Sequence, residues 1–239
     1  MLSTKAMPAS AGRPISAREL RRALTGSLRR LRTDFVDVYL LHGVTNDDYD
    51  HCVEELLPAL QAFRSEGLVR LVGLSERFPE DPAHAMLERA IPDAHWDVIM
   101  VGFNLLNQSA RRRVLPLATR HGIGVLCMFA VRKALAGPEH LRPLVARLAA
   151  EGRLGEQGLD PDDPLGFLVR EGHASSLVDA AYRFCRHEPG CHVVLTGTGS
   201  RAHLEDNVRS LGRGPLPDED VERLRRLFAG VDDVTGQET

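Results

Sequence analysis

Six short apolar runs alternate with segments of helical periodicity along this chain, and that alternation restricts its possible folds more than any other feature. The runs are nearly continuous in hydrophobic residues, which is typical of strands buried on both faces of a parallel sheet. The helices that connect such strands also cover them. The sequence therefore predicts an α/β fold whose strands lie at residues 1–5, 35–42, 69–74, 96–103, 123–129 and 192–195.

The helices are predicted from capping residues and leucine spacing. The first begins at Ser16, because a serine followed three residues later by Glu19 forms a capping box. Leucines from Leu20 to Leu31 recur at helical spacing and give this helix an apolar face. Further helices are expected at residues 53–63, 82–91, 110–121, 176–185, 204–211 and 218–228, and irregular structure at residues 6–14 and 152–172.

Composition places the chain among ordinary globular proteins. It has 239 residues, is 43% hydrophobic and 26% charged, and carries a formal net charge of −3. This charge gives no reason to expect nucleic acid or an anionic membrane as a partner. Its four cysteines form no tight framework and the first residues do not resemble a signal peptide, so we expect reduced thiols and a cytoplasmic protein.

The run from Phe35 to His42 contains the first candidate functional residue. It is predicted to be a buried strand that ends on His42, with Gly43 stopping it. Active sites of α/β barrels lie at the carboxyl ends of their parallel strands. A histidine there is a candidate for catalysis, although a rim or core histidine with one hydrogen bond is the alternative.

Four segments, taken in order, resemble the aldo-keto reductases: residues 27–42, 67–75, 103–107 and 195–207. The resemblance implies a TIM-type (β/α)8 barrel that reduces aldehyde or ketone carbonyls to alcohols with NADP(H) or NAD(H). By this comparison the first two βα units of the family have no counterpart here. We therefore expect one domain over residues 1–239, partial at its N-terminus, with an incomplete barrel.

The resemblance also assigns catalytic roles. His42 is similar to the histidine that orients and polarises the carbonyl oxygen, and Lys5 to the lysine that lowers the pKa of a catalytic tyrosine. The tyrosine and the aspartate that complete the family's set have no counterpart. We therefore expect impaired carbonyl reduction, and the alternative is a catalytically inactive member that binds a nucleotide or a protein.

Cofactor contacts are implied at two places. Ser75 matches the serine that meets the nicotinamide carboxamide, and Glu76 stands where many members have asparagine. Met100 replaces a frequent glutamine, and Met128 stands where an aromatic ring often stacks on the nicotinamide, although both methionines can equally be core residues. The segment assigned to phosphates and adenine comprises Gly197, Thr198, Gly199, Ser200 and Arg201, together with Asn207.

The chemistry of that segment supports the assignment. Glycines let the backbone approach a phosphate closely, and Ser200 is a candidate cap for the following helix. Arg201 is a candidate partner for a 2′-phosphate, with an exposed surface arginine as the alternative. The ligand-type residues between Cys185 and His192 do not match a zinc spacing, so no metal site is expected. Expected partners are a small carbonyl substrate and, through unpaired sheet edges, a second copy of the chain.

Overall fold

The computed structural model describes residues 1–170 and 172–237, and its internal contacts divide the chain into two compact units. The first unit contains Met1–Val101 and Pro116–Val125, and the second contains Gly102–Leu115 and Leu126–Thr239. In the described part of the chain, no helix has both the length and the apolar character that crossing a membrane requires.

All six predicted strands are present in one sheet. They are β1 (Ser3–Ala6), β4 (Val36–Val44), β5 (Val69–Glu76), β6 (Val98–Gly102), β7 (Gly124–Met128) and β8 (Val193–Val194), and the sheet follows that order. The pairs β1·β4, β4·β5, β5·β6 and β7·β8 are parallel. The prediction of a parallel α/β sheet is therefore confirmed.

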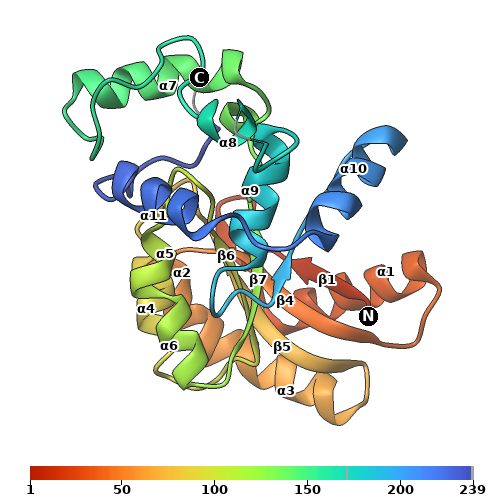
Figure 1. The fold of residues 1–239 in the computed structure, drawn as a ribbon. Helices are drawn as coiled ribbons and strands as arrows, with labels where there is room; N and C mark the ends of the chain where they lie inside the picture. The colour runs from red at the N-terminus through yellow and green to blue at the C-terminus, as the bar shows by residue number, and fades with distance from the viewer. Residues whose placement is uncertain (171, 238–239) are drawn as a thin grey trace. The chain divides into compact units, whose positions relative to one another are not determined.

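Helices of the first unit pack against β1, β4 and β5 (Figure 1). The predicted capping box is present at the start of the first one, where Ser16 accepts from the Glu19 N–H and the Glu19 carboxylate accepts from the Ser16 N–H. Tyr39 of β4 meets Phe63 of α3 edge to face, with ring centroids 6.5 Å apart. The bounds are α1 (Ala17–Leu31), α2 (Asn46–His51), a π-helical turn (Cys52–Leu56), α3 (Leu57–Ser65) and α4 (Ala85–Ala90).

In the second unit, α9 and α10 pack against each other and α9 contacts β8 (Figure 1). Ser176 caps the first of these helices and Ser200 the second, as expected for Ser200. The elements of this unit are α5 (Ser109–Arg113), a 3₁₀ turn (Lys133–Leu135), α7 (Pro138–Ala150), α8 (Phe167–Arg170), α9 (Leu177–Arg186), α10 (Arg201–Gly212) and α11 (Asp218–Leu227).

Three sequence predictions need correction. The predicted loop at residues 6–14 contains a hairpin of β2 (Ala9–Ser10) and β3 (Arg13–Pro14), whose two turn residues have positive φ as such tight turns require. The helix predicted at residues 110–121 is α5 followed by α6 (Leu115–Arg120), because Pro116 has no N–H to continue the ladder. The stretch predicted to be irregular at residues 152–172 contains the short helix α8, and α7, which has Pro143 in its interior, lies in a region for which no element was predicted.

The strand that carries His42 also differs from the prediction. Gly43 does not end it, because β4 continues to Val44 and pairs there with Glu76. Gly43 has a φ of 66°, and the register with β5 shifts between Leu41 and Val44. His42 therefore lies inside an irregular strand end and not at its last residue.

Gly73 on β5 gives a direct test of this sheet. A Cβ there would lie 1.9 Å from the Val98 carbonyl oxygen and 2.8 Å from Leu40 Cδ2. We expect Gly73→Ala to destabilise the protein by about 1–3 kcal/mol, because backbone must move. Denaturant unfolding measures this.

The matched control is Gly26→Ala within α1, where the nearest atom, in the flexible Arg30 side chain, lies 3.3 Å from the added carbon. This change should stabilise by about 0.5–1 kcal/mol, because alanine is the better helix former. Equal effects of the two substitutions would contradict the strand register.

Candidate functional site

Strand register places the predicted catalytic residues on one face of the sheet in the first unit. Lys5 on β1 pairs with Leu40 on β4, and His42 is two residues further along, so both side chains point to the same side. The Lys5 ammonium contacts the sulfur of Met100 on β6, with Nζ 3.9 Å from Sδ. The Lys5 side chain of β1 thus extends past β4 and β5 to contact a side chain of β6.

The electrostatics favour a neutral His42. Burial, followed by the positive charges of Lys5 and Arg77, lowers its pKa. Among the described residues, no group hydrogen-bonds to its buried Nδ1. Partial burial also lowers the pKa of Lys5, although the residue as a whole is exposed. A neutral imidazole carries one N–H that can donate to an oxygen, and the neighbouring cation adds to that polarisation.

The first unit places no tyrosine beside this pair. Tyr39 lies on the opposite face, against Phe63 of α3. Tyr49 is on α2, where its hydroxyl donates to Asp93 at 2.7 Å and accepts from Trp96. Burial is the main reason that the pKa of each phenol is raised. Neither phenol is therefore positioned to be the acid that Lys5 activates.

Ser75 lies on the same face as His42, because Leu40 pairs with Gly73 and Ser75 is two residues beyond it. It is fully buried, and its hydroxyl contacts the Glu76 carbonyl oxygen at 3.4 Å. Met100 is its neighbour in register on β6. Three residues singled out in separate strands, His42, Ser75 and Met100, therefore share one face.

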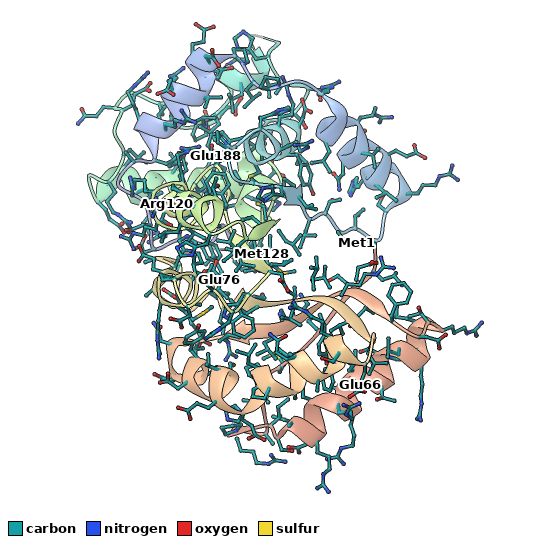
Figure 2. The ribbon with its side chains drawn as sticks, turned by 90° about the horizontal axis from the view of Figure 1, so that it is seen from below. Met1, Glu66, Glu76, Arg120, Met128 and Glu188 are labelled. Carbon is teal, nitrogen blue, oxygen red and sulfur yellow. The ribbon has the colours of Figure 1, made fainter. Side chains whose placement is uncertain are left out.

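Glu76 is engaged by a histidine that the sequence reasoning missed. Both carboxylate oxygens of Glu76, a residue labelled in Figure 2, lie within 3.1 Å of Nδ1 of His84. Both side chains are completely buried. The His84 ring stacks on Phe78 with centroids 5.5 Å apart. Its φ is 68°, a conformation uncommon outside glycine. No sequence spacing signalled this contact, because a folded loop brings His84 back to the strand end.

The remaining nicotinamide candidate, Met128, belongs to the second unit. It is the last residue of β7 and is buried, and its carbonyl oxygen accepts from the Phe103 N–H at 3.2 Å. The backbone of Met128 is thus used in the strand contact. Its thioether is apolar and polarisable, so it can pack against a flat ring as well as against core residues.

The second unit holds a cavity of about 540 Å³ that includes much of the predicted nucleotide segment. Its lining comes from the start and middle of α9, from the residues after β8, and from α10. A space of this size is in the range of small-molecule sites. Among its lining residues are Tyr182, Gly197, Thr198 and Asn207.

The glycine-containing segment is open around its backbone. A Cβ at Gly197 or Gly199 would meet no atom within 4 Å, so both positions border free space. Neither glycine has positive φ, so the backbone conformation itself does not require glycine there. The Thr198 hydroxyl accepts from the Ser200 N–H at 3.1 Å. Arg201 is exposed and its Nε lies 3.0 Å from a Glu205 oxygen, so in this state it is a surface arginine in an ion pair.

Asn207 is held by two residues that were not singled out from the sequence. Its Nδ2 donates to the Thr196 hydroxyl at 2.7 Å, and that oxygen lies 2.8 Å from the Tyr182 hydroxyl. Burial raises the pKa of Tyr182, which therefore keeps its proton. The position of Thr196 directly before the glycine segment was the only available signal. The Tyr182 contact depends on how α9 packs.

Comparison with known proteins gives a family. The model of the aldo/keto reductase family matches residues 1–229. An uncharacterized oxidoreductase of Bacillus subtilis, YqkF, is 23% identical over 86% of this chain, and the L-galactose dehydrogenase of Arabidopsis thaliana is 26% identical over 98%. This chain spans 64% of the length of the first relative and 70% of the second.

Solved structures agree on the fold. The holo form of aldo-keto reductase AKR11C1 from Bacillus halodurans has a TM-score of 0.65, with 23% identity over all of this chain and 75% of its own. An aldo/keto reductase from Klebsiella pneumoniae, solved with NADP and acetate, has a TM-score of 0.66 and 24% identity, covering 98% and 74%. With the parallel sheet, these similarities place the chain in the TIM-type α/β class.

The lowered pKa of His42 predicts an acid-sensitive term in stability. The folded state favours the neutral ring, so below the ordinary pKa of 6.5 the unfolded chain binds more protons. Stability is therefore lost as the pH falls through that value. We expect the melting temperature of wild type to fall more between about pH 7 and pH 5 than that of His42→Gln. Parallel melting curves for the two proteins would contradict the assigned environment.

Proposed function

Because this chain belongs to the aldo/keto reductase family, we propose that it is an NAD(P)H-dependent oxidoreductase that reduces the carbonyl group of aldehydes or ketones to alcohols. One observation carries the proposal: Lys5, His42 and Ser75 come from three neighbouring strands and share one face of the sheet. The chain spans only 64% of the length of the first relative, so the activity of the whole protein is itself a proposal.

The residues present fit this chemistry in the first unit. When bound, the reduced nicotinamide supplies a hydride to the carbonyl carbon. His42 donates a hydrogen bond from its N–H to the carbonyl oxygen, where negative charge develops, and the Lys5 ammonium stabilises the same charge. Solvent water supplies the proton that completes the alcohol, because no acid is positioned beside this pair among the described residues of the first unit. Burial beside Lys5 keeps His42 neutral, so it acts as a hydrogen-bond donor and not as a strong acid.

The residues present also fit a dinucleotide. Gly197, Thr198 and Asn207 line a cavity of suitable volume, and the open backbone at the glycines leaves room for phosphate oxygens beside the start of α10. We assign Gly197, Thr198, Gly199 and Ser200 to the phosphates and Asn207 to the adenine. Arg201 would have to leave Glu205 to bind a 2′-phosphate.

The nicotinamide end is assigned to Ser75, Glu76 and Met128. A carboxylate accepts hydrogen bonds but cannot donate them, so Glu76 can meet only the N–H₂ of a carboxamide, and its buried contact with His84 would have to open for that. His84 holds that carboxylate in place. Met128 offers an apolar contact to the ring.

A catalytically inactive, nucleotide-binding member is the second candidate. The observation that favours it is the position of Tyr39 and Tyr49, neither of which lies on the face of Lys5 and His42. We also propose a single domain over residues 1–239 and an incomplete barrel, for which the support is the six-stranded sheet in the described part of the chain. The cytoplasmic location stays a prediction that agrees with four buried free thiols, and compartment fractionation with an antibody to the chain would test it.

Exposed apolar residues support self-association as a further part of this proposal. β1 and β8 are the edge strands of the sheet, and Val193 and Leu195 are exposed at the second edge. Unpaired edges with apolar side chains favour pairing with another chain. A sedimentation profile that stays monomeric as the concentration rises would contradict it.

We predict slow NADPH-dependent reduction of aldehydes by the chain. Absence of a positioned general acid lowers rates by about 10²- to 10⁴-fold, and normal turnover is on the order of 1 per second or more. NADPH oxidation with an aldehyde panel measures this, and His42→Ala should remove what remains. His95→Ala, at an exposed histidine, is the control. No turnover at all would favour the inactive alternative, and a normal rate would contradict the impairment.

Cofactor binding gives an independent prediction. We expect NADPH to bind more tightly than NADH, and Gly197→Asp to weaken both, because a carboxylate repels phosphates. Arg201→Ala should reduce the preference for NADPH and leave NADH unaffected. Titration followed by reduced-nicotinamide fluorescence reports each constant. Arg18→Ala, on the exposed side of α1, is the matched control for a lost surface arginine. Unchanged binding in both site variants would argue against this segment.

A further inference from the structure

Three polar side chains, those of Tyr182, Thr196 and Asn207, are joined by hydrogen bonds beside the cavity between α9 and α10. These bonds orient the side-chain amide of Asn207. Tyr182 of α9 and Asn207 of α10 both line the cavity, although only 5% and 6% of their surfaces are exposed. Thr196 lies between them in space and directly precedes Gly197 in the chain. The three residues come from three separate segments of the second unit.

The hydrogen bonds determine which end of the amide is used. Nδ2 of Asn207 donates to Oγ1 of Thr196 at 2.7 Å. Oγ1 is also 2.8 Å from the Tyr182 hydroxyl, so the threonine oxygen is anchored from the other side. Among the described residues, none donates a hydrogen bond to the Asn207 carbonyl oxygen, and that oxygen is not sealed from solvent. The amide nitrogen is therefore engaged, and the amide oxygen is available to a ligand in the cavity.

We propose that Thr196 is a positioning residue that turns the Asn207 carbonyl oxygen toward the cavity, so that the subsite selects a purine carrying an exocyclic amine. This inference rests on the proposed function and specifies how its nucleotide end is recognised. Oδ1 accepts from the 6-amino N–H of adenine. A 6-oxo purine such as hypoxanthine presents an acceptor at the same place, and two acceptors facing each other repel.

The opposite orientation makes the opposite prediction. If the Thr196 hydroxyl donated to Oδ1, the Asn207 N–H₂ would face the cavity and would favour the 6-oxo purine. Tyr182 restrains the threonine hydroxyl in either case, so its role is to keep Thr196 in place. Ligand preference therefore reads out the amide orientation directly.

The test compares NADPH with its hypoxanthine analogue on the full chain. Dissociation constants come from fluorescence titration of wild type, Thr196→Val, Thr196→Ser and the control Thr25→Val, whose hydroxyl bonds only within α1. Wild type should bind NADPH about 5- to 10-fold more tightly than the analogue, as expected for one hydrogen bond. Thr196→Val should bring the two constants within about twofold, because the isosteric side chain cannot hold the amide.

The conservative variants separate positioning from general damage. Thr196→Ser keeps a hydroxyl and should retain the preference, and Thr25→Val should leave it unchanged. A purely structural loss would weaken both ligands equally and leave their ratio as in wild type, which would overturn the proposal. Equal binding of both ligands by wild type, or preference for the hypoxanthine form, would also overturn it while leaving the proposed function intact. Binding of neither dinucleotide by wild type would instead contradict the proposed function itself.

Discussion

The register of the parallel ladder in the first unit is the constraint on which the candidate site depends. Lys5 pairs with Leu40, Leu40 with Gly73, and Gly73 with Val98. Residues two positions further on lie on the same face, so His42, Ser75 and Met100 follow from the same pairing. The close approach of β5 to β6 at Gly73 shows how tightly this register is held. A shift by one residue would move every one of these side chains to the helix-covered face.

Burial determines what the polar groups at this site can do. His42 is kept neutral by its surroundings, whereas Glu76 is kept in place by His84 in a pair that is closed to solvent. Removing one member of this pair takes a hydrogen-bond partner from the other in the interior, so each residue constrains the other. The strained backbone of His84 is consistent with a position held by its contacts and not by local preference.

Burial also restricts a polar group in the second unit, where Asn207 borders an open cavity. Asn207 is nearly buried and its amide nitrogen is engaged by Thr196, so recognition is left to a single acceptor atom. The glycine segment beside it is bordered by free space, which suits a ligand that approaches the backbone. Thr196 orients the Asn207 amide, and the neighbouring glycines leave room for a ligand. Ligand sites commonly combine a few precisely placed polar groups with open space.

The sequence by itself determined the strands, the parallel sheet class, the capped starts of α1 and α10, and the family, because these depend on local periodicity and on residues close in the chain. Only the tertiary structure decided that β4 continues past His42, that Lys5 contacts Met100, that His84 binds Glu76, and that Thr196 joins Tyr182 to Asn207. These contacts join residues from different elements. Their partners are chosen by packing geometry, which no local pattern encodes.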